Sequence, residues 1–189
     1  MKIWELKSST DDYQSFHLLN YKEDNKYFKK QFNSKGKLSN SWTDIFIKLE
    51  DKGTRSDCPI FLGKSGVRMI SGKAKQILEP LIGDNVEFLP LIHTITNEKY
   101  YAIHVLNVLD ALDSDNTVFE KLSSGLIIGC EKYSFIPSIV QNQAIFKIYI
   151  NKIIHPTAIF VSDEFRNAVL ESDLKGFEFV EVWDSELNM

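Results

Sequence analysis

The sequence predicts an α+β fold, with a mostly antiparallel sheet and two or three short helices packed on it. Short segments with alternating apolar residues recur along the chain, as in half-buried strands. Only two segments have clear helical apolar spacing, whereas a doubly wound parallel sheet would need a helix after nearly every strand. The chain has 189 residues, of which 43% are hydrophobic and 25% charged, and it carries no repeat or long linker. We therefore expect a single domain over residues 1–189.

The N-terminal portion, residues 1–55, gives the weaker signals. Residues 1–7 are predicted to form a strand, and residues 13–19 are the candidate partner strand. Residues 20–41 combine lysine, asparagine and serine with interleaved aromatic residues. We expect a solvated loop or a short hairpin there, with the rings anchoring it to the core. Residues 42–49 alternate in side-chain bulk before a turn signal.

Two helices are predicted from capping residues and apolar spacing. Ser71 is placed to cap a helix over residues 71–81, in which apolar residues recur at i, i+3, i+4 and i+7. Pro80 and the glycine at position 83 are expected to end it. Ser162 is placed to cap a second helix over residues 163–171, whose first turn is acidic and suits the positive end of the helix dipole.

The remaining strands follow the same alternation. Residues 86–92 and 100–106 are separated by a polar connection and predict an antiparallel hairpin. Gly176 is expected to release the chain into the last strand. Further strands are expected over residues 125–128, 132–136, 144–150, 158–161 and 177–183.

Composition also limits the cellular setting and the class of site. Cys58 and Cys130 are far apart and form neither a zinc signature nor a disulfide framework, so we expect reduced thiols. No segment approaches the roughly 18 consecutive apolar residues that span a bilayer. Residues 1–7 lack the apolar core of a secretory signal. We therefore expect a cytoplasmic protein without a membrane partner.

Charge is distributed unevenly between the two parts of the chain. Residues 1–70 contain 13 basic and 9 acidic residues, a net of about +4, which leaves about −8 on residues 71–189. This field can steer a basic partner toward the C-terminal part, although it can equally serve solubility alone. The candidate partner contacts in that part are Asp110, Asp113, Asp115, Glu178, Glu181 and Asp184.

The acidic run at residues 110–115 is the pattern closest to a metal site. It lacks the glycine and the distal glutamate of a calcium-binding loop at their proper spacings. Asp113 and Asp115 are also common turn and cap residues, because their side chains bond nearby backbone amides. We therefore predict a structural or partner-binding role, and neither a metal nor another cofactor.

No sequence motif indicates catalysis. The four histidines lack metal-ligand spacing, and no Gly-x-Ser-x-Gly elbow is present. Two alternatives to a protein-binding function stay open. One is an enzyme in which Asp110, Asp113 and His104 converge around a pocket. The other is a small-ligand or nucleic-acid binding module that uses the lysine-rich segment 20–41, where bases could stack on aromatic rings.

Several blocks of residues 57–184 resemble the immunity family numbered eleven among bacterial polymorphic-toxin systems, formerly a domain of unknown function. The blocks are Ser71 to Leu81, Glu87-Phe88-Leu89-Pro90, Tyr100-Tyr101, Asn107-Val108-Leu109-Asp110-Ala111-Leu112-Asp113, Ile145-Phe146-Lys147, Ile159-Phe160-Val161-Ser162-Asp163-Glu164-Phe165 and Gly176-Phe177-Glu178-Phe179 with Trp183.

The resemblance implies a cytoplasmic protein made beside a toxin gene, which binds and blocks a cognate toxin domain and is not an enzyme. It implies a protein partner rather than nucleic acid, and it sets no oligomeric state. Interface hot spots are often tryptophans, so Trp42 joins the candidate contacts.

Overall fold

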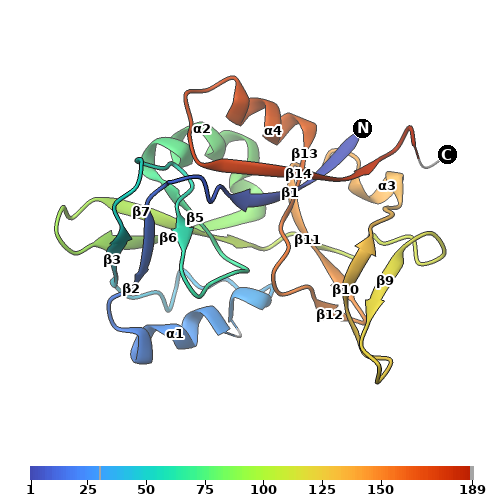
Figure 1. The fold of residues 1–189 in the computed structure, drawn as a ribbon, viewed down its shortest axis with the longest axis horizontal. Helices are drawn as coiled ribbons and strands as arrows, with labels where there is room; N and C mark the ends of the chain where they lie inside the picture. Colours follow the sequence, from blue (N-terminus) through green and yellow to red (C-terminus); the bar gives the residue numbers. More distant parts are fainter. Residues whose placement is uncertain (30, 188–189) are drawn as a thin grey trace.

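The computed structural model describes residues 1–29 and 31–187, which fold into two mixed sheets, a separate hairpin and four α-helices (Figure 1). The α+β class is confirmed. The expectation of mostly antiparallel pairing is wrong, because each large sheet contains parallel pairs, and there are more α-helices than the two or three expected. Among the described residues, no helix is both long and apolar enough to cross a membrane.

The first sheet, sheet I, contains the predicted hairpin at its centre. Strands β6 (Val86–His93) and β7 (Lys99–Val105) pair antiparallel, with Glu87 opposite His104 and Ile92 opposite Lys99. Strand β3 lies parallel to β6 on the other side, a long-range pairing that the local pattern did not indicate. In order across the sheet, the strands are β4 (Ile60–Phe61), β2 (Ser15–Leu18), β3 (Ile45–Asp51), β6 (Val86–His93), β7 (Lys99–Val105) and β5 (Arg68–Ser71).

The second sheet, sheet II, brings both ends of the chain together. Strand β1 (Lys2–Ser8) lies between β13 (Phe160–Ser162) and β14 (Phe177–Asp184) and is antiparallel to both. The expected pairing of residues 1–7 with residues 13–19 is therefore wrong. In order, the strands are β12 (Ile153–Ile154), β11 (Ile145–Ile150), β13 (Phe160–Ser162), β1 (Lys2–Ser8) and β14 (Phe177–Asp184), and β8 (Val108–Leu109) pairs parallel with β11.

A two-stranded hairpin stands apart from both sheets. It consists of β9 (Val118–Lys121) and β10 (Ile127–Lys132), so only the second strand overlaps a predicted one. The strand expected over residues 132–136 does not form, and Phe135 makes only an isolated bridge to Leu112.

The predicted helices form as α2 (Gly72–Ile82) and α4 (Asp163–Leu170). The Ser71 Oγ accepts a hydrogen bond from the Ala74 N–H at 3.1 Å, and the Ser162 Oγ accepts one from the Phe165 N–H at 3.3 Å. Both predicted N-caps are therefore confirmed. Helix α2 continues two residues past Pro80, because a missing N–H in the last turn costs only one intrahelical bond.

The loop expected within residues 20–41 is instead helix α1 (Tyr21–Lys29), followed by the 3-10 turn η1 (Gln31–Asn33). The first turn of α1 contains Glu23 and Asp24 and the last turn contains Lys26 and Lys29, which suits the helix dipole. Lysine and asparagine are so frequent in this segment that its composition resembles a loop, although the order of its charges is that of a helix. The remaining short helices are η2 (Gly83–Asn85) and α3 (Pro137–Val140).

The alternation of side chains along β7 separates two cores. Tyr100 and Ala102 face the core beneath α1, whereas Ile103 and Val105 face the core beneath α2 and α4. Helices α2 and α4 therefore lie on the opposite side of the molecule from α1 (Figure 1). A third, aromatic core lies beside the hairpin and is built around Phe135, Phe146, Phe160 and Trp183.

Candidate protein-binding surface

Asp113 holds the acidic loop between β8 and β9 in shape. Its carboxylate accepts hydrogen bonds from the Asp115 N–H at 3.1 Å and from the Asn116 side chain at 2.7 Å. Its own N–H donates to the Ser134 carbonyl at 2.9 Å. The bond from the Asn116 side chain is the main reason that the pKa of Asp113 lies below its ordinary value. Asp113 thus has the turn-forming role that the sequence analysis considered for it.

Asp110 and Asp115 are the exposed members of the same run, and their carboxylates bond none of the described residues. Asp110 lies at the rim of a cleft of about 440 Å³. The turn that joins β11 to β12 contributes Lys152 to the same cleft. The other lining residues are Leu112, Ser114, Phe119, Tyr149, Ile150 and Asn151. The lining of this cleft is mixed, with apolar side chains beside polar ones and with the unpartnered carboxylate of Asp110.

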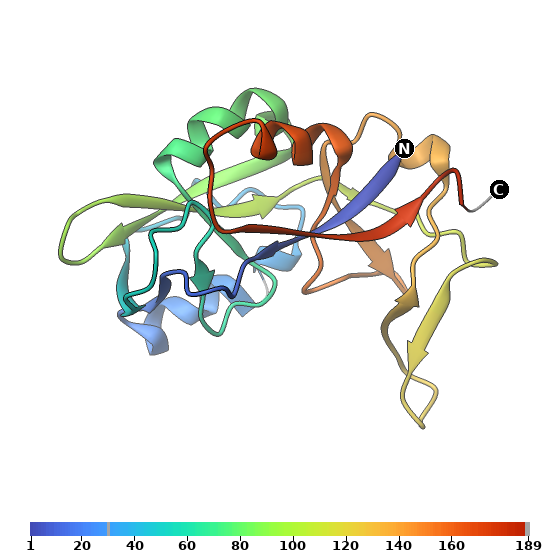
Figure 2. The same cartoon turned by 45° about the horizontal axis from the view of Figure 1, so that its top comes forward.

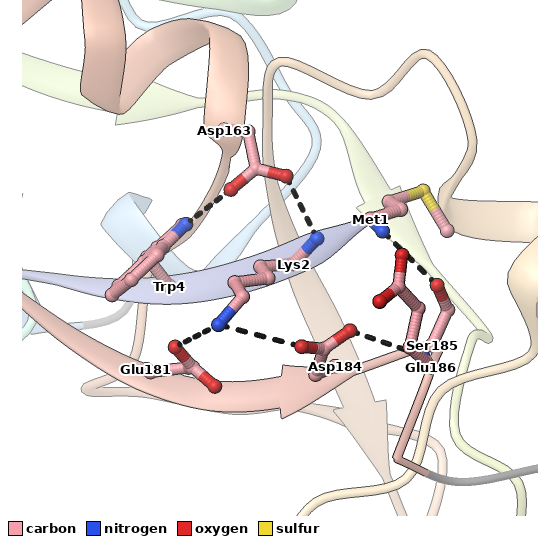
Figure 3. Close-up of polar contacts among 8 residues, drawn as sticks. All are labelled: Met1, Lys2, Trp4, Asp163, Glu181, Asp184, Ser185 and Glu186. Atoms are coloured by element: carbon pink, nitrogen blue, oxygen red, sulfur yellow. Dashed lines mark hydrogen bonds and ion pairs between the residues drawn. The ribbon is translucent and has the colours of Figure 1, made fainter.

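The carboxylates of β14 are largely engaged by the N-terminal strand (Figure 3). The Lys2 Nζ lies 2.7 Å from a Glu181 oxygen and 3.3 Å from an Asp184 oxygen. Asp184 is buried and also accepts a hydrogen bond from the Glu186 N–H at 3.0 Å. Glu178 is exposed and bonds none of the described residues. Glu181 and Asp184 therefore join β14 to β1, and Glu178 stays free.

A further carboxylate extends this network to helix α4. Asp163 accepts hydrogen bonds from the Lys2 N–H at 2.8 Å and from the Trp4 Nε1 at 2.9 Å (Figure 3). The Arg166 guanidinium lies 4.3 Å from the centre of the Trp4 ring. This end of β1 is thus fixed to α4 and β14 at once, which indicates a structural role for these charges.

Trp42 lies far from both acidic groups in sequence and anchors helix α1. Its indole N–H donates to the Pro90 carbonyl at 2.9 Å, and its ring lies 5.3 Å from Tyr27 and 5.7 Å from Phe28. The side chain is half-buried. Because its donor and much of its ring are already in use, Trp42 has a clear role within the fold.

The lysine-rich segment 20–41 places its phenylalanine rings inside the protein. Phe28 and Phe32 stack on each other with centroids 5.0 Å apart, and both belong to the core beneath α1. The Lys64 Nζ lies 4.4 Å above the Tyr21 ring. Rings buried in this way are not available for stacking on bases, so Phe28 and Phe32 offer no platform for nucleic acid.

His104, considered above for a catalytic pocket, is fully buried beneath α1. Its Nδ1 lies 2.9 Å from the Glu87 carboxylate and its Nε2 lies 3.1 Å from the Ser34 carbonyl. Glu87 also accepts hydrogen bonds from the Leu38 and Ser39 N–H groups. His104 is thus engaged by residues other than Asp110 and Asp113.

The other candidate chemical groups are dispersed or buried. Among the described residues, no three His, Cys, Asp or Glu side chains gather in a way that could hold a metal ion. Cys58 and Cys130 are free thiols, and burial raises the pKa of each to about 11. A high pKa leaves little thiolate near neutral pH and disfavours a nucleophilic role.

Several apolar residues of the β9–β10 hairpin are exposed, and none of them was among the contacts predicted from the sequence. They are Val118, Leu122, Leu126 and Ile128. The pattern in the sequence that could have predicted this hairpin is Ser123-Ser124-Gly125, a turn sequence between two apolar segments.

A comparison with protein families matches residues 19–184 to the Immunity protein family (Imm11). The match begins well before residue 57, so it includes α1 and most of sheet I as well as the blocks recognised in the sequence. A comparison with curated proteins finds no match.

Proposed function

The chain belongs to the immunity protein family Imm11, and on this premise we propose that it binds and neutralises a cognate bacterial toxin domain in the cytoplasm. It acts by covering a surface of the toxin and catalyses no reaction. It needs no metal or other cofactor, and it binds neither nucleic acid nor a membrane. The observation that carries this proposal is the family match over nearly the whole chain.

The acidic residues are the proposed means of capture. A negative field speeds encounter with a basic protein surface, and fast capture matters when the partner is toxic to the producing cell. The full set is Asp110, Asp113, Asp115, Glu178, Glu181 and Asp184, with Trp42 as an aromatic contact. Asp110, Asp115 and Glu178 carry most of this role, because they are exposed and bond none of the described residues.

The test uses the toxin domain encoded beside the gene for this chain. Co-expression with that domain should restore growth, and the two purified proteins should bind with an association rate that falls as salt is raised. The variant carrying Asp110→Lys and Asp115→Lys should bind about tenfold more slowly at low salt. The variant carrying Asp44→Lys and Glu171→Lys, at two exposed positions elsewhere, is the matched control for a double charge reversal of the same sign.

Three results separate the parts of the proposal. Failure of the unaltered protein to bind or protect would remove the immunity function. Protection with salt-independent association would keep that function and remove electrostatic capture. Slower binding by Glu178→Lys, with no change in the Asp110 and Asp115 variant, would move the contact from the 110–115 loop to β14.

A further inference from the structure

The β9–β10 hairpin projects from the body of the molecule and presents apolar side chains to solvent (Figure 2). Leu122 is 47% exposed, Leu126 59% and Ile128 46%, and Ile153 on the neighbouring β12 is 70% exposed. We call these four residues the hairpin face. Single exposed apolar residues are ordinary on protein surfaces, but a group of this kind marks an interaction site.

The hairpin is anchored at its base, so the exposed side chains are held in place. Phe119, Ile127 and Cys130 are half-buried against the third core. The register of β10 against β9 shifts between Ile127 and Gly129, which leaves Ile128 as an extra, outward residue. An isolated two-stranded sheet is marginally stable by itself, and contact with a partner would complete its packing.

The tip of the hairpin has a defined shape. The Leu122 N–H donates to the Leu126 carbonyl at 2.9 Å, and the Gly125 N–H donates to the Leu122 carbonyl at 2.8 Å. Gly125 has a φ of +80°, a conformation that glycine adopts without strain. The turn therefore holds Leu122 and Leu126 side by side as an apolar knob.

Two adjoining clefts connect the hairpin face with the acidic loop. A cleft of about 160 Å³ is lined by Leu126, Ile128 and Ile153, and it shares Ile150 and Asn151 with the larger cleft beside Asp110. One surface therefore runs from the apolar knob, over the β11–β12 turn, to the free carboxylates of Asp110 and Asp115.

We propose that the hairpin face and the adjoining Asp110 cleft form the toxin-binding surface, and that they receive a protein surface with an apolar centre and basic residues beside it. This inference rests on the proposed immunity function. Charge complementarity favours a basic toxin domain, because Asp110 and Asp115 attract basic residues of the partner to the 110–115 loop. Lys152 lines the same cleft, so the basic residues of the partner are expected beside the 110–115 loop rather than beside Lys152.

A second copy of this chain fits the surface less well. A two-fold contact places the same patch of each copy against the other. The apolar side chains could meet, but the second copy would bring its own free Asp110 and Asp115 to the interface, where a toxin domain would bring basic residues. A basic toxin domain has no such conflict.

The test measures the affinity for the toxin domain encoded beside the gene. Leu126→Asp and Ile153→Asp should each raise the Kd about tenfold or more, as expected for central interface residues, and the double variant should raise it further. Both positions are exposed, so the melting temperature should change little. Ile95→Asp is the matched control, since Ile95 is an exposed isoleucine on the β6–β7 turn at the opposite end of the molecule (Figure 1).

The outcomes distinguish this surface from the immunity function itself. If the unaltered protein protects cells and the double variant binds the toxin as tightly, the hairpin face is wrong although the function stands. If the unaltered protein neither binds nor protects, both proposals fail. Tighter binding of the toxin domain by the Asp110→Lys variant would contradict the proposal that the partner surface is basic. Concentration-dependent dimers abolished by the double variant, with unchanged toxin affinity, would assign the face to a second copy.

Discussion

The region beneath α1 buries polar side chains, whereas the β9–β10 hairpin exposes apolar side chains. Beneath α1, polar groups are buried and hydrogen-bonded, as in the contact of the buried His104 with Glu87. Lys147 is also buried there, and its ammonium donates to the Asn33 side chain at 3.0 Å. On the hairpin, apolar residues such as Leu126 face solvent and the nearby Asp110 bonds none of the described residues.

The contrast shows why residue type alone is a poor guide to a binding surface. The lysine-rich segment 20–41 has the composition of a binding segment, yet its helix completes a core. The hairpin has no recognisable motif, yet it exposes several apolar side chains. Substitutions beneath α1 should therefore change stability, and substitutions on the hairpin should change binding.

The largest expected effect on stability is at Phe32, whose ring contacts those of Phe28, Trp42 and His104. Phe32→Ala should lower the free energy of unfolding by about 3–5 kcal/mol, because it leaves a cavity in a close-packed core. Leu122→Ala on the hairpin should change it by less than about 0.5 kcal/mol. Urea denaturation measures the free energy of unfolding of both variants. Equal losses of stability would contradict the proposed contrast between the region beneath α1 and the hairpin.

A smaller effect is expected at Glu87. Burial by itself would raise the pKa of Glu87, but the hydrogen bonds from the Leu38 N–H and from His104 lower it to about 2. The group therefore contributes stability above its unfolded pKa of 4.5, and that contribution is lost as the pH falls toward 2. Glu87→Gln should cost about 3 kcal/mol at pH 7, since it removes one partner of a buried pair.

The pH dependence tests the cause of the loss at Glu87. The difference between the variant and the unaltered protein should shrink as the pH falls from 5 toward 2, because the unfolded chain takes up a proton near pH 4.5 while the folded carboxylate stays ionised until about pH 2. Glu120→Gln on the hairpin is the matched control and should be nearly neutral throughout. A loss that is the same at pH 3 and pH 7 would assign it to shape rather than charge.

The smallest of the three effects concerns Lys147. Burial, and then the nearby Arg68, lower the pKa of Lys147 to about 8 from 10.5. Between these values the unfolded chain binds more protons than the folded chain, so this group makes stability rise with pH from about 8 to 10.5. Lys147→Met removes that rise.

The relative stability of Lys147→Met should therefore fall by about 2 kcal/mol between pH 7 and pH 10. Comparison with the unaltered protein at each pH cancels the titration of the tyrosines and cysteines. Lys152→Met, at an exposed position in the β11–β12 turn, is the control and should show no such trend. A trend in both variants would contradict the assignment to burial.

The sequence by itself determined the elements whose signals are local. The caps Ser71 and Ser162, the helical spacing around Leu78, and the polar connection between β6 and β7 all act within a few residues. Leu78 is fully buried, as its place on the helical face predicts. The order of several blocks also sufficed to indicate the immunity family.

Only the tertiary structure decided which strands pair and which side chains remain free. The parallel contact of β3 with β6, and the place of β1 between β13 and β14, join segments that are distant in sequence. The same long-range packing pairs Asp184 with Lys2 and leaves Asp110 exposed, although both are aspartates in acidic stretches. Burial and pairing depend on neighbours brought from elsewhere in the chain, so periodicity and composition could not distinguish these two carboxylates.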